Sequence, residues 1–158
     1  MHKYVIVHFI HKPSQLEFPA SNWPLHITLL GNHNTPTLEY KLVKSLDSFV
    51  KTCSAFEVLV EDEAMFGIQK DILVSKLKIN KEILNLHKGL KDVLDINGAN
   101  YDNTSFIGQG YQPHSTVQKD SRLNANQTVL INSFSLVDMA PDGDTSKRKV
   151  IKTFYFEK

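Results

Sequence analysis

The chain has 158 residues, which is enough for one domain with a core of its own. Hydrophobic residues make up 41% and charged residues 22%, as in ordinary globular proteins, and no apolar stretch approaches the roughly 18 residues of a membrane-spanning helix. The formal net charge of +1 excludes a global field that would attract nucleic acid or membranes, so an anion must be bound by a local cluster. The single cysteine, Cys53, fits a reducing compartment, and we expect a cytoplasmic protein.

Short runs of β-branched, aromatic or alternating apolar residues predict the strands. The predicted strands cover residues 3–10, 25–30, 56–60, 71–79, the run around His114, 128–137 and 149–156. The polar segment 31–34 is expected to end the second strand, and 61–67 to form a bend. Residues 139–148 contain Pro-Asp-Gly-Asp, which is typical of a turn.

Two segments have the apolar spacing of an amphipathic helix. The first begins with Thr35 as N-cap and Pro36 at the first helical position, and it ends near Cys53. The second follows Asn80 as N-cap and stops at Asn97-Gly98. Because only two helices interrupt the strands, a single antiparallel α+β domain over 1–158 is favoured over a parallel sheet.

A histidine and a threonine two residues apart occur twice, each time on a strand-like run that a proline precedes. The first pair is His26 and Thr28, and the second is His114 and Thr116. Residues two apart in a strand point to the same face, so each run presents an imidazole beside a hydroxyl. One copy falls in each half of the chain, which predicts a site built from two matching strands.

The two His-x-Thr runs, 88 residues apart, resemble the signature motifs of the two-histidine (2H) phosphoesterase superfamily. That superfamily includes RNA 2′-5′ ligases and cyclic phosphodiesterases. The resemblance extends over nearly the whole chain, because the strands and helices follow the order found in the family. It implies a bilobal, pseudo-twofold duplication in which two antiparallel sheets flank a central cleft and the helices pack outside.

The resemblance also implies roles for the four motif residues. His26 and His114 would be general acid and base, in an order that the sequence does not decide, and Thr28 and Thr116 would donate to phosphate oxygens. Imidazoles titrate near neutrality, and each positioned proton transfer contributes roughly 10²–10⁴ in rate. Hydroxyl donors stabilise charge that develops on the non-bridging oxygens. No metal or other cofactor is needed, and the sequence has no ligand cluster with metal-binding spacing.

Several further residues are candidates for substrate contacts. Gln112 and Gln118 share the His114 face of a regular strand, and aromatic rings can stack on a base. The aromatic candidates are Trp23, Phe66 and Tyr111, and the candidates for a second phosphate are Lys76, Lys119 and Arg122. Members of the superfamily often carry a basic residue soon after the second threonine, and here Lys119 is a shifted substitute.

We therefore expect a monomeric, metal-independent phosphoesterase that hydrolyses a 2′,3′-cyclic phosphate or a 2′-5′ phosphodiester of RNA or a nucleotide, with 2′-5′ ligation as the reverse reaction. The partner is a nucleotide or an RNA end, without a membrane or a protein partner. The low net charge favours a small ligand over long RNA. One alternative is a non-catalytic or weakly catalytic protein that binds an RNA end or nucleotide in the same cleft. Another is an unrelated α+β domain, in which the two histidines would lie far apart.

Overall fold

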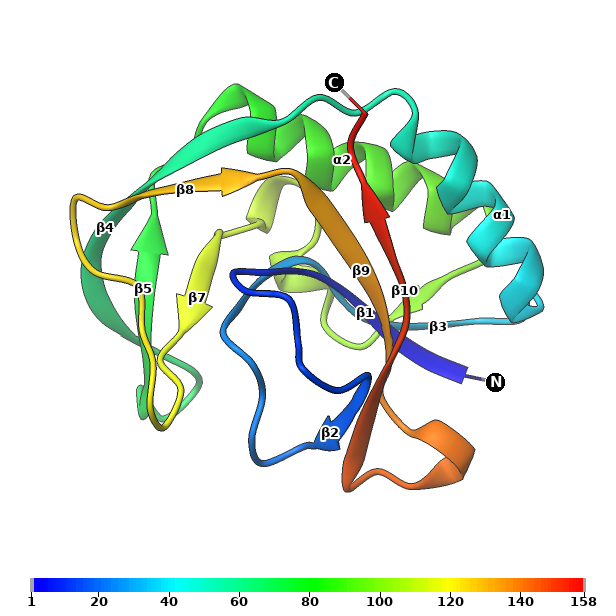
Figure 1. Cartoon of the computed structure of the whole chain (residues 1–158), viewed down its shortest axis with the longest axis horizontal. Coiled ribbons are helices and arrows are strands. Elements are labelled where there is room, and N and C mark those ends of the chain that lie inside the picture. The colour runs from blue at the N-terminus through cyan, green and yellow to red at the C-terminus, as the bar shows by residue number, and fades with distance from the viewer. Residues whose placement is uncertain (1, 158) are drawn as a thin grey trace.

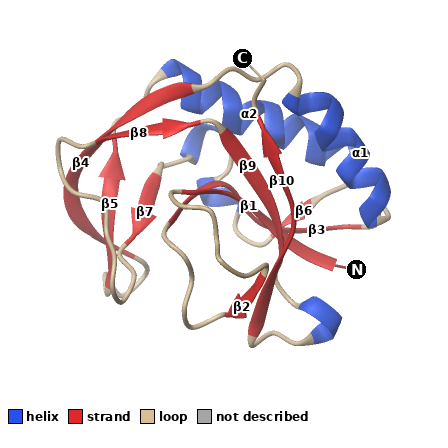
Figure 2. Cartoon of the chain, viewed as in Figure 1, coloured by secondary structure: helices blue, strands red, loops and turns tan. Residues whose placement is uncertain are grey.

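Two antiparallel sheets form the frame of the computed structural model, which describes residues 2–157 (Figures 1 and 2). One sheet has the strand order β2-β10-β9-β1-β3-β6, and the other has the order β7-β5-β4-β8. The strands are β1 (His2–Phe9), β2 (Glu17–Pro19), β3 (His26–Thr35), β4 (Phe56–Phe66), β5 (Ile72–Leu77), β6 (Asn100–Tyr101), β7 (His114–Thr116), β8 (Thr128–Ile131), β9 (Ser133–Asp138) and β10 (Lys147–Tyr155). The predicted α+β class with two antiparallel sheets is confirmed.

Two helices, α1 (Glu39–Val50) and α2 (Lys81–Ile96), lie together along the same side of the molecule (Figure 1). Their apolar stripes enter the main core, which they share with one face of the six-stranded sheet. The side chain of Asn80 accepts a hydrogen bond from the backbone N–H of Ile83 at 2.8 Å, so the predicted N-cap of α2 is confirmed. Gly98 has a φ of 77°, as a helix stop requires. Shorter 3₁₀ turns are η1 (Thr104–Phe106), η2 (Gly108–Gly110) and η3 (Pro141–Gly143).

The predicted start of the first helix and end of the second strand are wrong. Strand β3 continues through the polar segment 31–34 to Thr35, because His33 is fully buried and donates from Nδ1 to the carbonyl of Gly31 at 2.7 Å. Thr35 is therefore the last residue of a strand and not an N-cap. Its hydroxyl donates to the carbonyl of Asn97 and accepts from the N–H of Thr37, and α1 begins only at Glu39.

Two other predicted boundaries are wrong because strands bend or change sheets. Residues 61–67 are not a bend, since β4 runs to Phe66 with a register shift between Val60 and Glu63 opposite β5. The predicted strand 128–137 is broken at Asn132. Strand β8 pairs with β4 and β9 pairs with β1 and β10, so the chain passes there from one sheet to the other.

The two His-x-Thr strands meet although they belong to different sheets. Both β7 and the start of β3 have a buried residue between two half-buried ones; Ile27 is 0% and Ser115 1% exposed. The Ser115 hydroxyl donates to the carbonyl of His26 at 2.8 Å, and the Tyr111 hydroxyl donates to the carbonyl of Thr28 at 2.8 Å. These two bonds fix one motif strand against the other.

Replacing Ser115 by alanine tests this junction. The substitution leaves the buried carbonyl of His26 without its partner, so we expect a loss of about 1–3 kcal/mol in the free energy of unfolding, measured by urea denaturation. Ser48→Ala is the matched control, because the exposed Ser48 hydroxyl bonds only within α1, to the carbonyl of Lys44. Equal stability of the two variants would contradict the proposed importance of the junction.

Candidate active site

The two motif histidines are held by the same local hydrogen bond. Nδ1 of His26 lies 2.8 Å from the carbonyl oxygen of Pro24, and Nδ1 of His114 lies 2.7 Å from that of Gln112, in each case two residues upstream. A carbonyl oxygen only accepts, so Nδ1 is the protonated nitrogen in each neutral ring. Nε2 is therefore the unprotonated nitrogen, which can accept a proton from a reacting group.

Each of these imidazoles has an aromatic ring packed against it. The Trp23 ring centroid lies 4.5 Å from that of His26 with a tilt of 36°, and the Phe66 centroid lies 4.8 Å from that of His114, edge to face at 63°. Phe9 adds a second neighbour to His26, at 6.2 Å. These contacts restrict the rotation of both imidazoles.

Burial favours the neutral form of both histidines. It lowers the pKa of His26 to about 4, against the hydrogen bond to Pro24, and the positive charge that His114 can carry lowers the pKa further. Burial also lowers the pKa of His114, against the hydrogen bond to Gln112. Both rings are thus neutral at pH 7 in the free protein, and His26 is the harder of the two to protonate.

A cavity of about 520 Å³, here called the motif cavity, opens between the two motif strands and the tip of the β4–β5 hairpin. Its polar wall includes Thr28, His114 and Thr116. Its remaining side chains are mainly apolar or aromatic, and no Lys, Arg, Asp or Glu of residues 2–157 lines it. The predicted residues on its wall are Thr28, Phe66, Tyr111, Gln112, His114 and Thr116. The lining residues Ile68, Ile72, Asn103 and Phe106 carry no sequence motif and were not predicted.

The other predicted contacts lie outside this wall. His26 shares a face of β3 with Thr28 but packs against Trp23. Gln118 turns its amide back to the carbonyl of Thr116 at 3.2 Å, and Lys119 is exposed. Lys76 is exposed and pairs directly with His114 across β5 and β7, so it is on the His114 face of the sheet.

Arg122 is engaged elsewhere. It forms an ion pair with Glu63 at 2.7 Å. Its guanidinium is therefore already paired with a carboxylate of β4.

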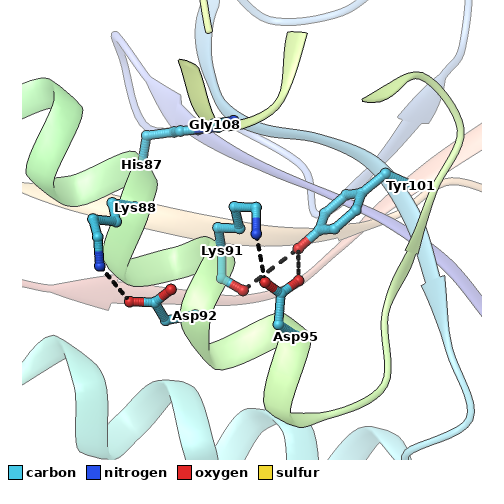
Figure 3. Close-up of polar contacts among 7 residues, drawn as sticks. All are labelled: His87, Lys88, Lys91, Asp92, Asp95, Tyr101 and Gly108. Atoms are coloured by element: carbon cyan, nitrogen blue, oxygen red, sulfur yellow. Dashed lines mark hydrogen bonds and ion pairs between the residues drawn. The ribbon is translucent and has the colours of Figure 1, made fainter. Parts of the chain in front are cut away.

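His87, on α2, connects β3 to the segment that leads into β7. Its Nδ1 lies 2.6 Å from the carbonyl oxygen of Leu29. Its Nε2 accepts from the N–H of Gly108 at 2.9 Å, and Figure 3 shows His87 beside Gly108. Its ring stacks on Tyr111 with centroids 4.0 Å apart and an angle of 2°. Since the Gly108 N–H only donates, His87 must be neutral with its proton on Nδ1.

Similarities to known proteins agree with this arrangement. Residues 8–134 match the model of the family described as the 2′-5′ RNA ligase superfamily. The chain belongs to this superfamily. The predicted resemblance is thereby confirmed.

The fold of the superfamily is also recognised in solved structures. A phosphoesterase crystal structure and E. coli LigT complexed with 3′-AMP each have a TM-score of 0.62 and 13% identity, with 99% of both chains covered. TT0787 of Thermus thermophilus has a TM-score of 0.57 and 15% identity, with 99% of this chain and 100% of that chain covered. No curated protein sequence matches the chain significantly. At these identities the similarity shows the shared fold.

The side chains of residues 2–157 provide no group of three or more His, Cys, Asp or Glu that could hold a metal ion. Neither helix in this range is long and apolar enough to cross a membrane.

The stability of the fold should depend on pH through its buried and half-buried histidines. Burial lowers the pKa of His8, His26, His33, His87 and His114. The unfolded chain then binds more protons, so this stability is fully present above about pH 6.5 and is lost as pH falls toward the folded pKa values. We expect urea denaturation to show a free energy of unfolding that decreases from pH 7 to pH 5, by up to about 1.4 kcal/mol per pH unit for each group.

His87→Phe tests one of these contributions. The variant keeps a ring against Tyr111 but leaves the Leu29 carbonyl and the Gly108 N–H unpaired, so we expect it to lose about 1–3 kcal/mol at pH 7. Its stability should also depend less on pH, because one titrating group is gone. A pH dependence equal to that of the unmodified protein would rule out a neutral, buried His87.

Proposed function

We propose that the chain is a metal-independent phosphoesterase that hydrolyses a 2′,3′-cyclic phosphate or a 2′-5′ phosphodiester of a nucleotide or an RNA end. The observation that carries this proposal is the matched anchoring of His26 and His114, which leaves Nε2 of each ring unprotonated on two strands that Ser115 joins. Membership in the 2′-5′ RNA ligase superfamily supports the reaction class. The buried free thiol of Cys53 suits a reducing, cytoplasmic location.

Hydrolysis requires two proton transfers on opposite sides of the phosphorus. Water attacks in line, and the bond to the leaving ribose oxygen breaks. We assign His26 as the base, since its strongly lowered pKa keeps Nε2 unprotonated and able to take the proton of water. His114 then supplies the proton to the leaving oxygen, after the bound phosphate anion has raised its pKa. When a ribose hydroxyl of another nucleotide replaces water as the nucleophile, the same two proton transfers form its bond to phosphorus and break one P–O bond of the cyclic phosphate, which gives a ligated phosphodiester.

The threonine hydroxyls can bind the phosphate oxygens of a nucleotide, and the motif cavity can bind its base. Thr28 and Thr116 line the cavity beside His114 and can donate to the non-bridging oxygens. Phe66 and Phe106 offer aromatic surface for a base, which contributes roughly 1–3 kcal/mol per stacked base. E. coli LigT has been crystallised with 3′-AMP, NADP+ and ATP, which supports a nucleotide as the type of ligand.

A second candidate function is nucleotide or RNA-end binding without efficient turnover. It is favoured by the place of His26, which packs against Trp23 and is not on the wall of the motif cavity. Binding of a 2′,3′-cyclic nucleotide, with no hydrolysis above that of the His26→Ala/His114→Ala double variant, would establish this candidate and refute the enzyme.

Alanine variants of the two histidines test the catalytic assignment. We expect His26→Ala and His114→Ala each to lower kcat/KM for adenosine 2′,3′-cyclic phosphate by about 10²–10⁴, with EDTA present throughout. His11→Ala is the control, since His11 is an exposed loop residue, and it should keep full activity. Unchanged activity in either motif variant would remove that histidine from the mechanism.

The pH dependence of kcat/KM tests the assignment of acid and base. The base must be neutral, so activity should fall as pH decreases through about 4, the pKa of His26. The acid must be protonated, so activity should also fall as pH rises through the lowered pKa of His114, below its usual 6.5. We expect a bell-shaped profile with its maximum between these limits. A maximum above pH 7 would contradict the assignment.

A further inference from the structure

A second cavity, of about 370 Å³ and here called the far cavity, lies where the two sheets join at β8 and β9. Both sheets contribute to it, since Thr128 comes from β8 and Ser133 and Ser135 come from β9. Its polar wall also includes Lys12, Asn132 and Thr153. Among residues 2–157, no Asp or Glu lines it.

The far cavity shares a face of the six-stranded sheet with the first His-x-Thr motif. Thr28 pairs with Val7, Val7 pairs with Ser135, and Ser135 pairs with Thr153, so these residues form one row across β3, β1, β9 and β10. Directly opposite residues of antiparallel strands project from the same face. With strands about 4.8 Å apart, Ser135 lies roughly 10 Å from Thr28 along this row.

His26 lies beside a lining residue of each cavity. Phe9 lines the far cavity, and its ring centroid is 6.2 Å from that of His26. Thr28, two residues from His26 on the same face, lines the motif cavity. A phosphate that reacts at His26 therefore lies near a lining residue of the motif cavity and near one of the far cavity.

The two cavities differ in charge. The motif cavity is lined by no Lys or Arg, whereas the far cavity is lined by Lys12, which is exposed and forms no ion pair within residues 2–157. The hydroxyls of Ser135 and Thr153 share a hydrogen bond of 2.7 Å, so only one of the two protons is used and the other is available. An ammonium with several hydroxyl and amide donors, and no carboxylate, suits a phosphodiester anion.

We propose that the far cavity binds the phosphodiester that adjoins the reacting phosphate in an oligonucleotide. The preferred substrate is then an RNA end that carries a 2′,3′-cyclic phosphate and extends by at least one nucleotide on its 5′ side. This inference rests on the proposed function and specifies the substrate of the same site. One lysine provides for a single additional phosphodiester, in accord with the low net charge, and not for a long RNA duplex.

The test compares adenosine 2′,3′-cyclic phosphate with adenylyl-(3′-5′)-adenosine 2′,3′-cyclic phosphate. We expect kcat/KM to be about tenfold higher for the dinucleotide, the effect of one charge-assisted hydrogen bond. Lys12→Ala should bring the ratio of the two values close to one. Lys44→Ala, which removes an exposed lysine of α1, should leave the ratio unchanged. Since each phosphate contact adds about 0.7 to the salt slope on single strands, the dinucleotide should also be the more salt-sensitive substrate.

Two kinds of failure can be told apart. Normal hydrolysis of both substrates with equal kcat/KM, or a dinucleotide preference that survives in both Lys12→Ala and Ser135→Ala/Thr153→Val, overturns the far-cavity proposal alone. No hydrolysis of either substrate, or full activity in His26→Ala and His114→Ala, overturns the proposed function itself.

Discussion

The hydrogen bond from the Ser115 hydroxyl to the His26 carbonyl is the contact on which the proposed site depends most. Strands β3 and β7 belong to different sheets, so no backbone ladder fixes their separation. Ser115 stands between His114 and Thr116 and bonds to the backbone of the other motif histidine, so it couples the positions of both imidazoles. A second hydrogen bond, from the Tyr111 hydroxyl to the Thr28 carbonyl, also joins the segment before β7 to β3. Separating the two strands would leave buried carbonyls without hydrogen-bond partners, which costs free energy, so the contact between the strands is favoured.

The histidines are likewise held in place by hydrogen bonds to backbone groups. His26, His114 and His87 each donate from Nδ1 to a backbone carbonyl oxygen, and this hydrogen bond fixes the tautomer. Burial then favours the neutral rings. In His87 the second nitrogen, Nε2, also has a hydrogen-bond partner, the N–H of Gly108, so this ring serves only to hold the backbone in position. For His26 and His114 the second nitrogen is left unprotonated, and the positive charge needed for catalysis is expected to arrive only with an anionic substrate.

The features that the sequence predicts correctly are those that depend on residues a few positions apart. The alternation of His26, Ile27 and Thr28 is a property of any strand, and the Asn80 cap depends on residues three apart. Polar residues that are buried by distant partners were not predictable in this way. The polar residues around His33 predict the end of the strand, yet β3 continues through His33 because the fold buries this side chain. The Ser115 bond to His26 spans 89 positions, and no local pattern indicates it.

In the proposed mechanism, one phosphate bridges the two motif imidazoles. The most direct test is an NMR titration of the histidine rings, alone and with adenosine 3′-monophosphate. We expect the nucleotide to raise the pKa of both His26 and His114, because its anionic charge lies beside both Nε2 atoms, while His87 remains neutral. A nucleotide that binds and shifts the pKa of only one motif histidine, or of neither, would show that no single phosphate bridges the two rings.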